Sequence, residues 1–140
     1  MIRRPPRSTL SSSSAASDVY KRQKLIIAGE AYESLDKYKS IINEYDINQN
    51  VVWIHEFLSN NMIEKLMIAS DLLVLPYKTA SQSGVLSQAW QYNLPSIVTK
   101  VGGLPEYVDH GESGYVVETN DICELKQKII HFFESEEFMQ

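Results

Sequence analysis

Short apolar runs alternate with segments of helical periodicity from residue 24 onward. Such runs, bounded by polar or turn-forming residues, predict strands. The first two are almost entirely apolar, which is typical of strands buried on both faces of a parallel sheet. The runs lie at 24–29, 51–54, 71–75, 95–99 and 115–117.

The segments between these runs predict helices. Leu35, Tyr38, Ile41 and Ile42 recur at the spacing of one helix face. The polar side chains of 59–61 and of Asp121 can accept a hydrogen bond from the first turn of a helix, and so predict helix starts. The expected helices cover 31–46, the residues from 62 to 69, 85–92, a short turn at 104–109, and 122–133.

Strands that alternate with helices predict an α/β fold, with right-handed crossovers and a doubly wound parallel sheet covered on both faces. Sheets of this kind bind ligands in the loops at the carboxyl ends of their strands. In this chain those ends are Gly29, His55 with Glu56, Pro76 with Tyr77, the segment 100–103, and Glu118. We therefore expect function to lie in these loops.

Composition excludes several classes. The 140 residues are 44% hydrophobic and 22% charged, as in one globular domain. Every apolar run is much shorter than the roughly 20 residues of a membrane span. The net charge of −5 argues against nucleic-acid binding. The single cysteine, Cys123, can form no intramolecular disulfide and is expected to be a small core residue. His55, His110 and His131 lack the spacing of metal ligands, so we expect no metal and no cofactor.

Residues 1–23 differ from the rest of the chain. Their net charge is +4 while that of residues 24–140 is −9. They are rich in arginine and serine, as transit peptides are, and lack the apolar stretch of a secretory signal. The string MIRRPPRSTLSSSSAASDVYKRQ also resembles the read-through translation of a sequencing-library adapter. We expect residues 1–23 to be a non-native or disordered leader, residues 24–140 to form the domain, and the protein to be cytoplasmic.

The sequence lacks the phosphate-binding loops of three nucleotide-dependent classes of enzyme. Within residues 28–33 only Gly29 is a glycine, whereas a dinucleotide-binding loop needs G-x-G-x-x-G. The chain also has no Walker phosphate loop. An NAD-dependent oxidoreductase, a kinase and an ATPase are therefore all disfavoured.

A hydroxyl-rich loop at 76–83 leads directly into a predicted helix. Free N–H groups and the helix dipole at such a start can bind a phosphate or diphosphate. Ser83 supplies a hydroxyl, and Gly84 lets a phosphate approach the backbone. From local sequence alone, the favoured interpretation is that Ser81 or Ser83 simply caps the helix.

A second glycine loop follows the next strand. Gly102 and Gly103 either form a tight turn or present their backbone to a ligand, with Glu106 at the rim. The two loops end neighbouring strand–helix units, so both are expected to reach one cleft.

Three stretches carry a resemblance to a known family. They are LIIAGE (25–30), NVVWIHEFLSNNMIEKLMIASDLLVLPY (50–77) and ASQSGVLSQAWQYNLPSIVTKVGGLPEYVDHGESGYVVE (80–118). Together they resemble the carboxy-terminal, donor-binding domain of GT-B retaining glycosyltransferases of the glycogen-synthase and sucrose-synthase type, glycosyl transferase group 1. The resemblance implies transfer of a hexose from a nucleoside-diphosphate sugar to a hydroxyl acceptor, with retention and without a bound metal. It also implies an amino-terminal acceptor domain that this chain lacks. It leaves open peripheral membrane association of the full enzyme.

The resemblance also implies roles for individual residues. The donor diphosphate would lie over Gln82, Ser83, Gly84 and Val85. The ribose and donor sugar would contact Gln88, Ser81, Gly102, Gly103 and Glu106. The base would lie against His55 and Glu56. No catalytic residue can be assigned within this segment.

The chain departs from the family pattern at three positions. Two glutamates of the pattern fall at Ala80 and Gln88, of which only Gln88 can still hydrogen-bond a ribose. A glycine of the pattern falls at Asn93, which is tolerable if the backbone there is left-handed. The missing acids keep a non-catalytic nucleotide-sugar-binding domain open as an alternative. A GT-B sugar-nucleotide epimerase is a further one. The donor sugar, base and acceptor stay undetermined.

Overall fold

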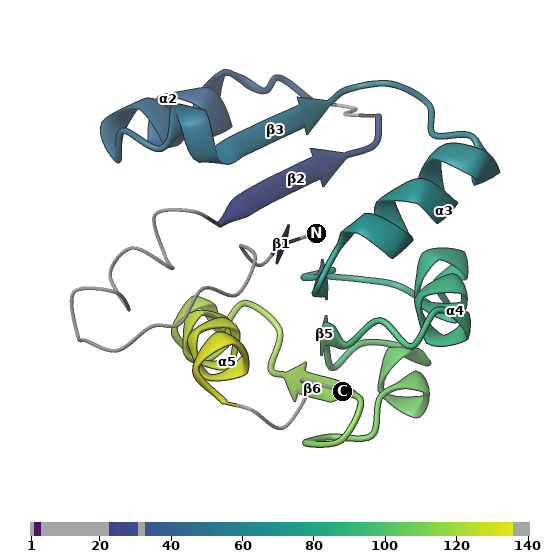
Figure 1. The fold of residues 1–140 in the computed structure, drawn as a ribbon. Coiled ribbons are helices and arrows are strands. Elements are labelled where there is room, and N and C mark those ends of the chain that lie inside the picture. Colours follow the sequence, from purple (N-terminus) through teal and green to yellow (C-terminus); the bar gives the residue numbers. More distant parts are fainter. Residues whose placement is uncertain (1, 4–22, 31–32, 136–140) are drawn as a thin grey trace, which may run out of the picture.

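The computed structural model describes residues 2–3, 23–30 and 33–135. The described residues form four helices, two 3-10 turns and six strands, and from β2 onward they alternate as the sequence predicts (Figure 1). The strands are β1 (Ile2–Arg3), β2 (Lys24–Ala28), β3 (Val51–Ile54), β4 (Leu73–Leu75), β5 (Ser96–Thr99) and β6 (Gly114–Val117). The helices are α2 (Asp36–Glu44), α3 (Asn60–Ala69), α4 (Gly84–Gln91) and α5 (Ile122–Glu134), with 3-10 turns η1 (Asn48–Asn50) and η2 (Leu104–Tyr107).

The strands form two hydrogen-bonded sheets, ordered β1-β2-β3 and β4-β5-β6. The pairs β2–β3, β4–β5 and β5–β6 are parallel, which confirms the predicted α/β class. Among the described strands, β3 and β4 are not paired, so the single continuous sheet that was expected is divided into two. On the side of β2 that faces the second sheet, the described residues include the two-residue β1, which pairs antiparallel with Lys24 and Leu25 (Figure 1).

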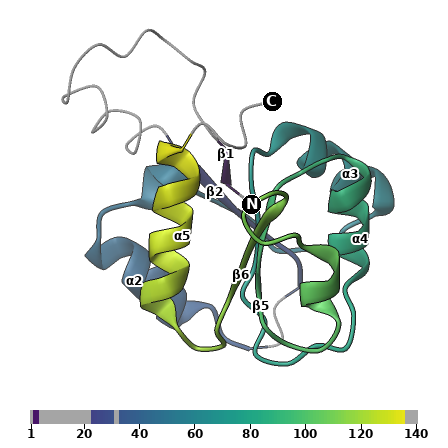
Figure 2. The ribbon, with the colours of Figure 1, turned by 90° about the horizontal axis from the view of Figure 1, so that it is seen from below.

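Helices cover both faces of the second sheet, as a doubly wound arrangement requires. Figure 2 shows α5 on one side of β5 and β6, with α3 and α4 on the other. Ile97 and Val98 are adjacent in β5 and fully buried, and they belong to two separate core clusters. The cluster around Val98 includes Met67, Leu86 and Leu104, and the cluster around Ile97 includes Phe132. The core of the molecule therefore lies around β4–β6.

The first sheet carries less of the core than the sequence predicts. Leu25 and Ile27 are 36% and 37% exposed, so the expectation that this strand is buried on both faces is wrong. The buried residues of both core clusters come from residues 67–132, so neither cluster includes a residue of β2. Cys123, expected in the core, is exposed on α5.

Several local predictions are confirmed. Ser59 caps α3 by accepting a hydrogen bond from the Met62 N–H at 3.3 Å, and Asp121 caps α5 through Glu124 N–H at 2.9 Å. The first predicted helix is shorter than expected: it begins at Asp36, and residues 31–32 lie outside the described part of the chain. Most of the leader, residues 4–22, also lies outside it, so the assignment of residues 1–23 stays a prediction. Among the described helices, none is long and apolar enough to cross a membrane.

Candidate functional site

Two hydrogen bonds hold the loop 76–83 at the carboxyl edge of the second sheet. The buried Thr99 at the end of β5 donates its hydroxyl to the Tyr77 carbonyl oxygen at 2.5 Å. Farther along, the Gly103 N–H donates to the Ser81 carbonyl oxygen at 2.9 Å. The loop after β4 is thus tethered to the end of β5 and to the loop that follows it. Thr99 received no role from the sequence, because its partner is 22 residues away and is a backbone atom.

The second glycine loop packs directly against the first. Gly102 has a φ of +51°, and a Cβ there would come within 1.9 Å of the Ala80 carbonyl oxygen. A Cβ at Gly103 would lie 3.1 Å from the Ser81 carbonyl oxygen. Both glycines are therefore used in a backbone-to-backbone contact between the loops. The contact brings the two loops to one edge of the sheet.

The start of α4 offers unpaired backbone donors. Ser83 is 8% exposed, and its hydroxyl oxygen accepts the Leu86 N–H at 3.2 Å, so the capping role left open by the sequence is the one observed. Within the described part of the chain, the N–H groups of Gly84 and Val85 have no hydrogen-bond acceptor. A Cβ at Gly84 would meet nothing within 4 Å, so the space beside these donors is open. With the helix dipole, this end of α4 is suited to an anion.

The remaining residues of this loop and helix lie around that start. Gln82 and Ser81 are exposed just before it. Gln88 is half-buried one turn after Gly84, and residues four apart lie on the same helix face. Asn93 has a φ of 51°, which confirms the left-handed backbone expected where the family pattern has glycine.

The other predicted site residues lie farther from this start. Glu106 is exposed on η2, which follows the second glycine loop. His55 and Glu56 are exposed after β3, which belongs to the other sheet, and no hydrogen bond or strand pairing of the described residues joins them to either glycine loop. The printed contacts of the described residues therefore join the two glycine loops through Ser81, Gly102 and Gly103, and they include neither His55 nor Glu56.

Two cations lie at the same edge of the sheet without having been assigned from the sequence. Lys78 is exposed in the hydroxyl-rich loop itself. Lys100 follows β5 and lies 3.6 Å from the Glu118 carboxylate after β6, with both side chains exposed. The sequence feature that could have identified Lys78 as a site residue is that it is the single basic residue between a strand end and a helix start. At the far end of α4, the Glu64 carboxylate, which accepts a hydrogen bond from the Tyr92 phenol, raises the pKa of that phenol. No group of three or more His, Cys, Asp or Glu in the described residues could hold a metal ion.

Comparison with known proteins agrees with this architecture. The model of the family "Glycosyl transferases group 1" matches residues 11–140. N-acetyl-alpha-D-glucosaminyl L-malate synthase of Bacillus anthracis is 29% identical over 81% of this chain and 29% of its own length. An uncharacterized glycosyltransferase of Methanocaldococcus jannaschii is 28% identical over 88% of this chain and 34% of its own length. The structure of sucrose-phosphate synthase from Thermosynechococcus elongatus superposes with a TM-score of 0.69 at 19% identity, over 81% of this chain and 29% of that one. The chain thus spans about a third of the length of these proteins.

Proposed function

The chain belongs to the glycosyl transferases group 1 family, and from that premise we propose that it is the donor-binding part of a hexosyltransferase. The donor is a nucleoside-diphosphate sugar, and the hexose passes to a hydroxyl group of a saccharide or lipid-linked acceptor with retention of configuration. The names of the curated relatives, which include a glucosaminyl-malate synthase and glycosyltransferases, support a hexosyl donor. Acceptor binding is assigned to residues outside this chain, which spans about a third of those relatives.

One observation carries the placement of the donor. The N–H groups of Gly84 and Val85 donate no hydrogen bond to any described residue, and the space beside Gly84 is open. A diphosphate oxygen placed there would accept both N–H groups and lie at the positive end of α4. Lys78, exposed on the same loop, adds a cation that the anion can recruit.

The rest of the donor follows from this placement. Gln88, one turn farther along α4, is within the reach expected for the ribose, to which its amide can donate or accept. The transferred sugar is then expected to contact Ser81 and the loop that contains Gly102, Gly103 and Glu106. In the proposal, His55 and Glu56 contact the base at the edge of the first sheet.

The chemical contribution of these residues is stabilisation of the departing diphosphate. In the transfer, the bond between the anomeric carbon and a phosphate oxygen breaks, and a bond from the acceptor oxygen to that carbon forms. Negative charge then accumulates on the nucleoside diphosphate, where fixed N–H donors and a helix dipole interact with it more strongly than with the intact donor. The acceptor hydroxyl proton leaves to a group outside this chain.

Calorimetric titration of the chain with UDP, GDP, ADP and dTDP tests this placement. Gly84→Asp should weaken binding of the preferred nucleotide by about 2 kcal/mol or more, or roughly thirtyfold, because an acid then occupies the anion position. Gly84→Ala separates bulk from charge, since its Cβ meets open space. Gln91→Asp places the same acid at the other end of α4 and should bind like the parent. If the parent binds and a normally folded Gly84→Asp binds equally well, the diphosphate lies elsewhere.

A non-catalytic nucleotide-sugar-binding domain is the second candidate. Ala80 offers no polar side chain where the family pattern has a glutamate, and Gln88 replaces the other acid. Product analysis on the longer protein distinguishes the candidates: a glycosylated acceptor indicates transfer, an altered free donor indicates an epimerase, and an unchanged donor indicates binding alone. The 140-residue chain by itself should bind nucleotide and transfer no sugar.

A further inference from the structure

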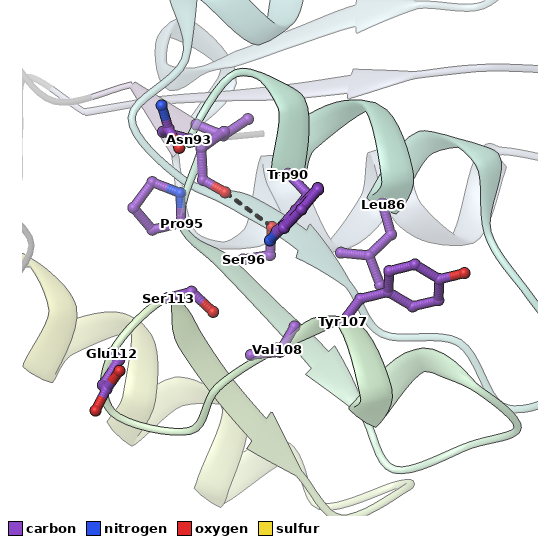
Figure 3. Close-up of a pocket in the computed structure, with 10 residues that line it drawn as sticks. Leu86, Trp90, Asn93, Pro95, Ser96, Tyr107, Val108, Glu112 and Ser113 are labelled. Atoms are coloured by element: carbon purple, nitrogen blue, oxygen red, sulfur yellow. Dashed lines mark hydrogen bonds between the residues drawn. The ribbon is translucent and has the colours of Figure 1, made fainter.

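A cavity of about 420 Å³ lies at the opposite end of the second sheet from the donor loops. Its walls include Ser96, the first residue of β5, and Pro95 just before it, whereas the donor loops (76–83 and 100–103) follow the ends of β4 and β5. Figure 3 shows that its side chains come from α4 with the turn after it, from the start of β5, from the end of η2 with the residue that follows, and from the loop before β6. The buried Leu86 and Val108 give it an apolar floor that is continuous with the core. None of the residues assigned to the donor lines it.

Two aromatic side chains stand at this cavity in contact with solvent. Trp90, in the last turn of α4, is 67% exposed, and Tyr107 at the end of η2 is 38% exposed. A large indole left this exposed beside a hollow offers a flat apolar face to a ligand. The C–H face of a pyranose ring is a partner of matching shape and polarity for such a surface.

The polar side chains at the cavity are available to a ligand. In the described part of the chain, the side chains of Asn93 and Glu112 make no hydrogen bond or ion pair. The Ser113 hydroxyl oxygen accepts the Asp109 N–H at 2.9 Å and keeps its own proton for donation. An amide, a carboxylate and a hydroxyl therefore line the same cavity as the two aromatic side chains. This set matches the mixed donors and acceptors of a polyol.

The charge at the cavity distinguishes between ligand classes. No lysine or arginine is among the residues that line it, while Glu112 brings a carboxylate. A phosphate-bearing nucleotide would therefore meet an uncompensated negative charge, whereas sugar hydroxyls would donate to that carboxylate. A neutral ligand is favoured.

We propose that this cavity is a second saccharide site, which binds a neutral oligosaccharide with one pyranose ring packed on Trp90 and hydroxyls hydrogen-bonded to Glu112, Asn93 and Ser113. This proposal rests on the proposed function in one respect only, which is that a glycan is present near the protein. Such a site would hold a glycan chain on the donor-binding domain without occupying the donor loops.

The test is calorimetric titration of the chain with four neutral probes: maltotetraose, cellotetraose, chitotetraose and mannotetraose. At least one should bind saturably in the millimolar range or tighter, and Trp90→Ala should weaken that binding about tenfold or more. Glu112→Gln, which keeps the shape and removes the charge, should weaken it less. Trp53→Phe removes the other tryptophan, in β3, and should leave it unchanged.

Two results would overturn the proposal: no saturable binding of any probe, or a folded Trp90→Ala that binds as tightly as the parent. Titration of the same variants with the nucleotide that the parent prefers keeps this test separate from the donor site. Trp90→Ala should bind that nucleotide normally, and Gly84→Asp should bind the saccharide normally. If Gly84→Asp loses the saccharide while Trp90→Ala retains it, the saccharide occupies the donor loops and the second site is wrong.

Discussion

Gly102 lies against Ala80 so closely that a Cβ at residue 102 would come within 1.9 Å of the Ala80 carbonyl oxygen. The Gly102 φ of +51° is also one that side chains rarely adopt. From the sequence, this glycine is explained equally well by a tight turn or by a backbone facing a ligand. The structure supplies a third reason, which is the packing of one strand-end loop on another. The position of the first loop, and of the helix start that follows it, depends on this contact.

Gly102→Ala should therefore destabilise the fold. The added methyl group collides with backbone rather than with a flexible side chain, so the two loops must separate. We expect a loss of about 1–3 kcal/mol in the free energy of unfolding, with a fall of several degrees in Tm followed by circular dichroism. Gly84→Ala is the matched control, because its Cβ meets open space, and its Tm should not fall. Equal Tm values for Gly102→Ala and the parent would show that the loops do not need this contact.

Alanine substitutions at two helix-capping serines can separate an effect on fold stability from an effect on nucleoside-diphosphate binding. Ser59 and Ser83 each accept one N–H at the start of a helix, at 3.3 and 3.2 Å. Replacing either by alanine should cost about 1 kcal/mol of stability. Only Ser83→Ala should also weaken nucleoside-diphosphate binding, by about 1 kcal/mol, since Gly84 and Val85 keep their donors. Denaturant unfolding and calorimetry measure the two effects. A loss of nucleotide binding in Ser59→Ala would mean that binding reports helix stability alone.

The leader should contribute little to the fold. In the described residues its contribution is β1, which pairs two residues with β2. Deletion of residues 1–22 removes that pairing and keeps Gln23, whose carbonyl oxygen accepts a hydrogen bond from the Asn50 amide at 3.0 Å. We expect a change of at most about 1 kcal/mol, the scale of cross-strand pairs. A fall in Tm of many degrees would show that these residues pack against the domain.

The features predicted well are those encoded within a few residues. The strand over 51–54 was predicted at the bounds observed, because an apolar run between polar turns is a local signal. The caps at Ser59 and Asp121 were predictable for the same reason: side chain and N–H partner are three residues apart. The loops at the strand ends followed from parallel topology.

What the sequence could not supply depends on residues distant in the chain. The exposure of Leu25 and Ile27 is decided by what packs over β2, and an apolar run does not carry that information. The bond from Thr99 to Tyr77 spans 22 residues and leaves no pattern in either segment. The aromatic cavity likewise arises from Trp90 and Glu112, which no periodicity connects. Residues this far apart in the sequence come together only through the tertiary fold.

Gln88 provides the last prediction, at the position where the family pattern has a glutamate. It is half-buried one turn after Gly84, on the face where the proposed diphosphate lies, so a carboxylate there can replace the amide as a hydrogen-bond acceptor for the ribose. Gln88→Glu should bind the nucleoside diphosphate within about threefold of the parent, and Gln88→Leu should lose about 1 kcal/mol, or roughly fivefold. Gln91→Leu, exposed on the same helix, controls for the general effect of leucine. Calorimetry with the preferred nucleotide measures all three. If Gln88→Leu binds as tightly as Gln91→Leu, the ribose does not contact residue 88, and the donor must lie along another face of α4.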